Sequence, residues 1–536
     1  MIDVGVRIAT SIALTCLFYV ANFKSLGILQ QCGYHNSAFV RWMKRKDNMY
    51  LSRLSLWALC MLFAELVTSV VLSPFGLEVS TLLGLAVYMV FSFSYCIIDK
   101  KYALKVPVNV TNRFKRLSVG YVFVLSVANF AVLSLLSFLA VVIDNDLYSL
   151  FQFLPFALMP FVLPYLLLFA NKILSPFEKA NNRKYVLKAG EVLEKCKALR
   201  IGVVGSYGKT SVKNVLYSLL SVKYSVIVTP ESYNTPAGVA KTVNCLNVEN
   251  ADVFIAEMGA RRVGDVAELC ELVKPDYAIF VGVCAQHIET FKTEENLINA
   301  KCEIVKGTKN VVVCGAGLKN KISSVLTEED LKKCVFLGDT VEEVVYEKNR
   351  TRFVYKMKNG EKVNVETSML GRSAVENISL AVSLAEELGL TKEEIESGIA
   401  KIKPVPHRLQ LIENGGVYVL DDAYNCSEQS AKEAIAALNR FENKRIVVTP
   451  GIVEGGILEE KINSELGALL ASANLDKVIL VGETLVKAIS NGYKTANGDM
   501  SKLQTVPTLE QAKTLVGGLL SEGDAVLFLN DLPDAY

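Results

Sequence analysis

Residues 200–211 read Arg-Ile-Gly-Val-Val-Gly-Ser-Tyr-Gly-Lys-Thr-Ser. The apolar run predicts a buried strand, the glycines predict a tight turn, and Lys209 and Thr210 stand where a helix should begin. Glycines allow backbone N–H groups to surround a phosphate, and a helix N-terminus adds a favourable dipole. In such a loop the lysine neutralises phosphate oxygens and the threonine ligates Mg²⁺. The stretch predicts a nucleotide-binding α/β domain, although Val203 replaces the first glycine of the full motif.

Two further apolar runs extend the predicted sheet. Residues 251–257 form a strand that ends in Glu257, a helix covers 264–274, and a third strand covers 275–283. A doubly wound sheet presents metal ligands at the carboxyl ends of its strands, so Glu257 is a candidate magnesium ligand. His287 follows the third strand, where it would contact a metal or a phosphate. A purely structural role for this histidine stays open.

The first third of the chain has a different composition. The whole chain has 536 residues, of which 51% are hydrophobic and 21% are charged, a mixture typical of a membrane part joined to a soluble part. Each of five apolar runs is near the length that crosses a bilayer. The runs cover residues 4–22, 54–73, 79–98, 117–143 and 147–171. We therefore expect a helical membrane domain with about five spans over residues 1–175.

The charges between these runs predict an orientation. The first and third connections carry six Lys or Arg residues each, between residues 24 and 53 and between 100 and 116, whereas Glu78, Asp144 and Asp146 mark the others. The positive-inside rule places the N-terminus outside and everything after residue 174 in the cytoplasm of a multi-pass membrane protein. Glu65 lies within the second run, where a carboxylate is costly, so a functional role and a neutral hydrogen-bonded form are both open.

Residues 176–197 carry apolar side chains at helical spacing among charges, which predicts an amphipathic connector helix. The net charge of +2 gives no indication of nucleic-acid binding. Twelve scattered cysteines form no C-x-x-C pair, which favours free thiols and argues against a zinc site.

Several motifs beyond the glycine loop resemble the Mur ligase family. They are GSYGKTSVKN (205–214), ESYNTPAGVAKTVN (231–244), AEMGARRVGDVAELCELVKPDYAIFVGVCAQHIETF (256–291), INAKCEIVKG (298–307), PHRLQ (406–410) and DDAYNCSEQSAKEAI (421–435). The resemblance implies an ATP-binding central domain at 198–403 and a Rossmann-like α/β C-terminal domain at 404–536. Its order and spacing are more specific than one phosphate loop.

The resemblance implies an ATP-dependent amide-bond ligase of the cell-wall (peptidoglycan) type. In that family ATP phosphorylates a carboxylate, and an amine displaces phosphate from the acyl phosphate. The acceptor would be a peptide on a wall precursor, and the amine an amino acid or a dipeptide such as D-Ala-D-Ala. Charge accumulates in both steps, so cations and Mg²⁺ must be arranged in advance.

The family motifs also suggest residue roles. The implied catalytic residues are Lys209, Glu257, His287 and Lys301. The implied metal ligands are Thr210, Glu257, His287 and Lys301, the lysine as a carbamate formed with CO₂. The implied ATP-binding residues are Gly205, Ser206, Tyr207, Gly208, Lys209, Thr210, Ser211, Asn377, Arg408, Asp422 and Tyr424. Asn234 and Thr235 would lie near the reacting carboxylate. Without the resemblance, Lys301 would be read as a solvated helix lysine.

Two departures leave the substrates open. No UDP-binding N-terminal domain is recognisable, and the membrane domain stands in its place, so the acceptor could be UDP-linked or polyprenyl-linked. The chain ends in FLNDLPDAY where soluble family members carry a KGSR-like element, which leaves recognition of the amine open. The alternatives are another Mur-like amino-acid ligase of the folylpolyglutamate type, a nucleotide-driven membrane transporter, and a membrane scaffold.

Overall fold

The computed structural model describes residues 4–44, 106–143, 154–284, 293–424, 426–453 and 458–531, together with Leu104, Phe291 and scattered residues between 56 and 97. The chain divides into two compact units, which cover Met1–Asn181 with the last five residues, and Asn182–Asp531.

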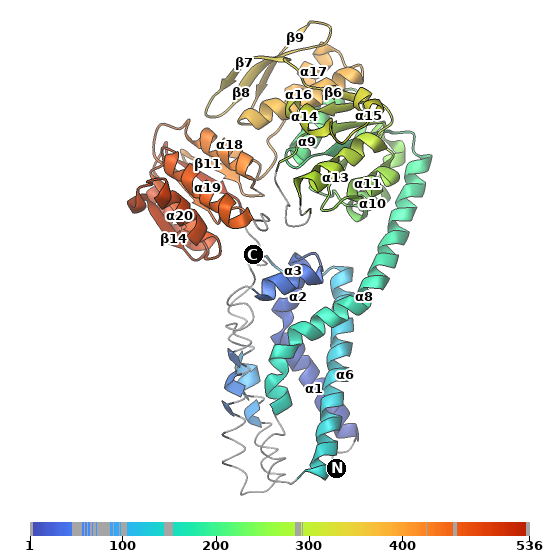
Figure 1. The fold of residues 1–536 in the computed structure, drawn as a ribbon, viewed down its shortest axis with the longest axis vertical. Coiled ribbons are helices and arrows are strands. Elements are labelled where there is room, and N and C mark those ends of the chain that lie inside the picture. Colours follow the sequence, from blue (N-terminus) through green and yellow to red (C-terminus); the bar gives the residue numbers. More distant parts are fainter. Residues whose placement is uncertain are drawn as a thin grey trace. The chain divides into compact units, whose positions relative to one another are not determined.

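The first unit is helical (Figure 1). Its principal described helices are α1 (Val4–Ala21), α2 (Phe23–Gln31), α3 (Asn36–Lys44), α6 (Asn112–Val142) and α8 (Leu154–Lys195). Two helical segments, Asn112–Val142 and Leu158–Lys195, are long and apolar enough to cross a membrane, and the pair Arg7–Ala21 and Phe23–Gln31, bent by 49°, could form a third span. The predicted runs at 54–73 and 79–98 lie largely outside the described residues, as does Glu65. The count of five spans therefore stays a prediction.

Polar contacts join the helices of this unit. The Asn22 amide donates to the Tyr121 hydroxyl at 2.8 Å, and the Asn129 amide donates to the Thr15 hydroxyl at 3.0 Å. Such interhelical hydrogen bonds satisfy polar groups that lipid cannot. Farther along, Arg116 makes two hydrogen bonds to the Glu178 carboxylate, at 2.6 and 2.9 Å. These contacts tie α1 to α6 and α6 to α8.

Helix α8 is one element of 42 residues and continues across the predicted boundary at residue 175. The described part of the predicted fifth span, from residue 154 on, and the predicted connector thus belong to a single helix, with Pro176 inside it. At its C-terminal end Ala189 and Leu193 are buried in the same apolar cluster as Val266 and Leu269 of the next domain. The amphipathic pattern of residues 176–197 therefore reflects packing against the α/β domain.

The central domain has a six-stranded parallel sheet in the order β2-β3-β1-β4-β5-β6. The strands are β1 (Leu199–Val204), β2 (Val226–Val228), β3 (Val253–Met258), β4 (Tyr277–Phe280), β5 (Val312–Cys314) and β6 (Cys334–Phe336). The main helices are α9 (Lys209–Leu220), α10 (Pro236–Cys245), α11 (Asp265–Val273), α13 (Glu294–Gly307), α16 (Arg372–Glu387) and α17 (Lys392–Ile399). Shorter helices α14 (Lys319–Ile322) and α15 (Glu328–Lys332) follow β5.

Helices cover both faces of this sheet because its strands are apolar on both sides. Phe254 and Ala256 of β3 belong to one apolar cluster, and Ile255 of the same strand belongs to another. An antiparallel sheet of β7 (Val341–Tyr346), β8 (Thr351–Lys356) and β9 (Lys362–Thr367) extends the second cluster through Phe353 and Val363. This arrangement is the predicted doubly wound α/β domain.

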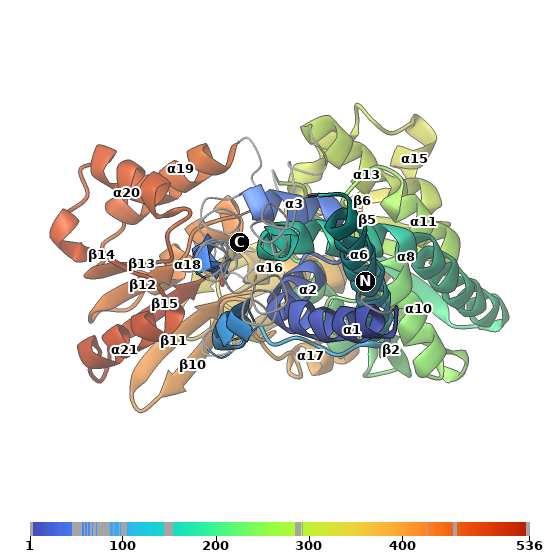
Figure 2. The same cartoon turned by 90° about the horizontal axis from the view of Figure 1, so that it is seen from below.

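The C-terminal domain has a second six-stranded sheet, in the order β10-β11-β15-β12-β13-β14, whose strands lie side by side in Figure 2. Only the β10–β11 pair of this sheet is antiparallel. The strands are β10 (Gln410–Asn414), β11 (Val417–Asp422), β12 (Arg445–Thr449), β13 (Lys477–Val481), β14 (Leu503–Val506) and β15 (Ala525–Leu529). The helices are α18 (Glu428–Leu438), α19 (Glu459–Ser472), α20 (Val486–Thr495) and α21 (Leu509–Leu519).

Candidate active site

The nucleotide loop joins β1 to α9. Gly208, immediately before the helix, has a φ of +72°, and a Cβ added there would lie 2.7 Å from the Asn377 Oδ1 atom. A side chain at this position would therefore be strained and would collide with Asn377. The Lys209 ammonium turns back and donates to the Gly205 carbonyl at 2.8 Å. The loop thus brings the predicted residues of 205–211 together with Asn377 of α16.

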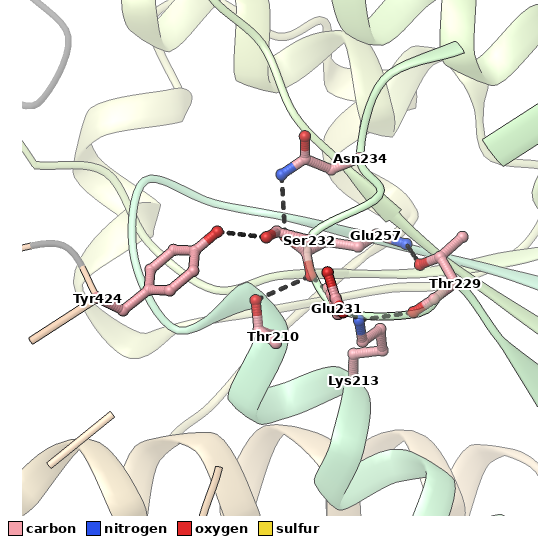
Figure 3. A network of polar contacts seen from close by, with 8 residues as sticks. All are labelled: Thr210, Lys213, Thr229, Glu231, Ser232, Asn234, Glu257 and Tyr424. Carbon is pink, nitrogen blue, oxygen red and sulfur yellow. Dashed lines mark hydrogen bonds and ion pairs between the residues drawn. The ribbon is translucent and has the colours of Figure 1, made fainter. Parts of the chain in front are cut away.

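Glu257 connects this loop to the segment after β2, which carries Asn234 (Figure 3). Residue 257 lies near the carboxyl end of β3 and pairs with Val203 of β1, so its side chain emerges beside the loop. Its Oε2 atom accepts a hydrogen bond from the Thr210 hydroxyl at 2.9 Å. Its Oε1 atom accepts one from the Asn234 amide at 3.0 Å. Thr210 and Asn234, which were predicted separately, thus meet at the carboxylate of Glu257, a third predicted residue.

Lys213 is a site residue that the sequence analysis missed. Its ammonium lies 3.4 Å from Glu257 Oε2, and each of the two side chains is only 1% exposed. It also donates to the Thr229 carbonyl at 2.7 Å and to the Glu231 carbonyl. The available signal was its spacing, because residues four apart on a helix share a face and Lys209 begins the same helix.

The segment after β2 is held in place by its own backbone. The Asn234 carbonyl accepts a hydrogen bond from the Gly259 N–H at 2.7 Å. Thr235 is the N-cap of α10, because its hydroxyl accepts from the Gly238 N–H at 3.2 Å, and Pro236 begins that helix. Asn234 therefore faces Glu257, whereas Thr235 has a structural role at the helix terminus.

Lys301 lies on α13 and is 2% exposed, which is rare for a lysine. Burial and, to a smaller extent, the positive charge of Lys209 lower the pKa of Lys301 to about 7. Asp265 and Glu303 act in the opposite direction. Lys301 is therefore a buried, readily neutral amine rather than a solvated cation. His287 lies outside the described residues.

The C-terminal domain contributes Arg408, Asp422 and Tyr424. The Arg408 guanidinium lies 4.0 Å from the centre of the Tyr424 ring. Asp422 Oδ1 accepts a hydrogen bond from the Leu409 N–H at 3.0 Å, and burial raises the pKa of Asp422 to about 7 although that bond and Arg408 oppose the rise. The Tyr424 hydroxyl meets the Ser232 hydroxyl, so this domain contacts the segment after β2 (Figure 3).

Arg408 is held in a strained loop. Its neighbours His407 and Leu409 have φ values of +60° and +48°. Residues other than glycine rarely adopt this left-handed backbone region. Burial lowers the pKa of Arg408, and the carboxylates of Asp422 and Glu257 oppose that shift. Backbone strain of this kind is concentrated at functional sites, because surrounding contacts must maintain it.

The site has more positive than negative groups. The ammonium groups of Lys209 and Lys213 and the Arg408 guanidinium each interact electrostatically with the Glu257 carboxylate. Burial lowers the pKa of Lys209, and the charge of Glu257 partly restores it. Such an excess of cations suits a polyphosphate, whose negative charge they offset.

Comparison with known proteins decides the family. The Mur ligase middle domain matches residues 203–385, and the Mur ligase glutamate ligase domain matches residues 407–530, together more than half of the 536 residues. The chain belongs to the Mur ligase family. It is accordingly an ATP-dependent ligase, as the motifs indicated, and both predicted ligase domains are confirmed.

Several relatives share one name. The UDP-N-acetylmuramoyl-tripeptide–D-alanyl-D-alanine ligase of Bacillus subtilis is 27% identical over 61% of this chain and 72% of its own length. The enzyme of the same name from Escherichia coli is 28% identical over 58% and 69%. The crystal structure of MurF ligase from Thermotoga maritima in complex with ADP covers 65% of this chain and 80% of its own, with 26% identity and a TM-score of 0.57.

Lys301 gives this Mur ligase a testable pH dependence. Burial lowers the pKa of Lys301 to about 7, whereas a lysine in the unfolded chain has a pKa near 10.4. Between these two pH values the unfolded chain therefore binds up to one more proton than the folded chain. The free energy of unfolding should therefore rise with pH across this window, by at most about 1.4 kcal/mol per pH unit.

Calorimetry of the full chain in detergent, at several pH values, measures this change in the free energy of unfolding. Lys301→Met should raise the unfolding temperature of the ligase domains at pH 7 and reduce its dependence on pH. Lys306→Met is the matched control, because Lys306 is an exposed residue of the same helix. Equal pH profiles for wild type and Lys301→Met would contradict the burial of a neutral lysine.

Proposed function

We propose that this ligase joins an amino acid or a dipeptide, such as D-Ala-D-Ala, to the peptide carboxylate of a peptidoglycan precursor. The observation that carries the proposal is the Glu257 carboxylate, which receives hydrogen bonds from Thr210 of the nucleotide loop and from Asn234. The group that binds nucleotide and the group placed to meet an acceptor are thereby held together. The names of the relatives support the choice of substrates.

The reaction proceeds through an acyl phosphate. Lys209 and the N-terminus of α9 would hold the transferred phosphoryl group and offset the negative charge that develops on the leaving oxygen of ADP as the bond to it breaks. Asn234 orients the acceptor carboxylate that attacks it. The amine then displaces phosphate and forms the amide bond. Lys209 stabilises charge in both steps, which is why its effect should appear in the rate.

Magnesium fits the donors that these residues present. The Thr210 hydroxyl and the Glu257 carboxylate are hard oxygen ligands 2.9 Å apart, the type that Mg²⁺ prefers. Lys301, with its pKa near 7, is a neutral amine able to add CO₂, and its carbamate would supply further oxygens. His287 is proposed as an additional ligand from its position in the sequence. Bound Mg²⁺ neutralises charge on the phosphates.

The C-terminal domain completes the nucleotide site. We assign the ribose to Asp422, with Tyr424 continuing the same motif, the phosphates to Arg408, and the adenine side to Asn377 of the central domain. The contact between the Tyr424 and Ser232 hydroxyls joins this domain to the segment that carries Asn234. Closure of the domain before chemistry would exclude water from the acyl phosphate.

Lys209→Ala should lower turnover on the order of 10²-fold or more, since the lost charge acts most strongly in the transition state. Phosphate release by the full chain in detergent measures this, with a UDP-linked tripeptide and D-Ala-D-Ala. Lys223→Ala is the control. The Lys223 ammonium lies 3.3 Å from the Glu394 carboxylate and is not one of the site residues.

Wild-type phosphate release should require both the carboxylate acceptor and the amine, which a transport ATPase would not. Near-normal release in Lys209→Ala, or release that needs neither substrate, would contradict the assignment.

We further propose that the acceptor is linked to a polyprenyl carrier and that the helical unit helps to hold it. The helices of residues 112–142 and 158–195 support membrane insertion, with the ligase domains on the cytoplasmic side. Basic residues cluster at the start of α6, where Lys115 is exposed and Arg116 is paired with Glu178. Such a cluster suits anionic lipid groups or a pyrophosphate.

This acceptor hypothesis predicts a preference. The full chain in detergent should show a higher kcat/KM for a polyprenyl-pyrophosphate-linked tripeptide than for the UDP-linked tripeptide. A polyprenyl pyrophosphate without peptide should compete with the lipid-linked acceptor. The KM of the amine should be the same with both acceptors and serves as the control. Equal or better use of the UDP-linked acceptor, without competition, would show that the helices are an anchor only.

A further inference from the structure

Lys213 is one of the residues of the polar network in Figure 3. From α9, its ammonium reaches two other parts of the central domain. It donates to the Thr229 carbonyl at 2.7 Å and to the Glu231 carbonyl, and it lies 3.4 Å from Glu257 Oε2. These partners belong to the segment after β2 and to β3.

The number of these partners separates Lys213 from Lys209. An ammonium group has three N–H donors, and Lys213 has three protein oxygens around it. Its side chain is 1% exposed. A phosphate would have to replace one of these contacts to reach it. Lys213 is therefore placed to act through Glu257 rather than on the nucleotide.

Further contacts connect Glu257 to residues 229–235, which carry Asn234 and are called the acceptor-facing segment. The Thr229 hydroxyl accepts from the Glu257 N–H at 3.0 Å, and the Thr229 N–H donates to the Ile255 carbonyl at 3.0 Å. Lys213 adds the carbonyl of Thr229 and that of Glu231 to this set. Residues 229–231 are thus joined to both β3 and α9, three positions before Asn234.

The energetics of a buried ion pair favour a role in orientation. Removing two charges from water costs several kcal/mol per ion, and apolar replacements of such pairs are often neutral or stabilising. Lys213 of α9 and Glu257 of β3 are both buried, and Val212 of the helix and Ile255 of the strand belong to one apolar cluster. Oε2 of Glu257 receives the Lys213 charge and the Thr210 hydroxyl together, which leaves the carboxylate little freedom to rotate.

We propose that Lys213 is a positioning residue for magnesium-dependent nucleotide binding. It holds the Glu257 carboxylate in one orientation and fixes residues 229–231 beside it. The inference rests on the metal role of Glu257 in the proposed function. Loss of an outer partner of a metal ligand typically lowers metal affinity between about 10- and 100-fold, and Lys213 is such a partner.

The test measures ADP binding by the full chain in detergent over a range of Mg²⁺ concentrations. Lys213→Met should raise the Mg²⁺ concentration for half-maximal binding between about 10- and 100-fold. ADP affinity without Mg²⁺ should stay within about twofold of wild type, which a merely structural role would not preserve. Lys223→Met is the matched control, since Lys223 follows the same helix and pairs with Glu394.

A double variant keeps the test valid if Lys213→Met does not fold. Lys213→Met/Glu257→Gln leaves no uncompensated buried charge, and it is compared with Glu257→Gln alone. The two should require the same Mg²⁺ concentration, because Lys213 acts through Glu257. A further loss in the double variant would overturn the inference, as would a normal Mg²⁺ requirement in a folded Lys213→Met.

The wild type separates this inference from the proposed function. If wild-type ADP binding depends on Mg²⁺ and Glu257→Gln weakens that dependence, the metal role holds and the Lys213 variants decide the inference alone. If neither is observed, the proposed metal role of Glu257 fails and the inference fails with it.

Discussion

A buried carboxylate organises the active site of this chain. Glu257 is 1% exposed, and its oxygens are shared by the Thr210 hydroxyl, the Asn234 amide and the Lys213 ammonium. A carboxylate so far from water must be paired and hydrogen-bonded, or its charge would be too costly to retain. The position of each partner therefore depends on the others. The loop that begins α9, the segment that carries Asn234 and strand β3 are held together by one group.

Parallel strand order produces this arrangement. Strands β1 and β3 are neighbours, so the loop after β1 and the acid at the end of β3 emerge at the same edge. Strand β2 lies on the other side of β3 and places the 229–235 segment there. Chain segments far apart in sequence thus reach one point through ordinary sheet pairing. The C-terminal domain joins them through Tyr424 and Ser232.

The local parts of this site were predictable from sequence. The loop at 205–208 and the acid at 257 follow from apolar runs and their terminations, which are short-range signals. The pairing of Thr210 with Glu257 needed the strand order, which a single sequence does not supply. Lys213 was missed because helical spacing gives the face of a residue but not what lies opposite. Lys301 required the family motif, since its burial depends on packing of α13 that no local pattern encodes.

The N-terminal part was predictable to a lesser degree. Hydropathy located α6 and the start of α8 because long apolar runs have few alternatives. It did not predict that α8 continues without a break to Lys195, because a change from apolar to charged residues is also typical of the end of a membrane span. Arg408 and Asp422 were likewise identified only by the family motifs, because they lie in a separate domain from the loop at 205–211.

The central claim is that this site makes an acyl phosphate from a peptide carboxylate. The most direct measurement supplies the tripeptide acceptor with ¹⁸O in its terminal carboxylate, together with ATP and D-Ala-D-Ala. The account predicts that each turnover transfers one ¹⁸O atom from the carboxylate to inorganic phosphate. Phosphate that carries oxygen from water, with none from the acceptor, would contradict it.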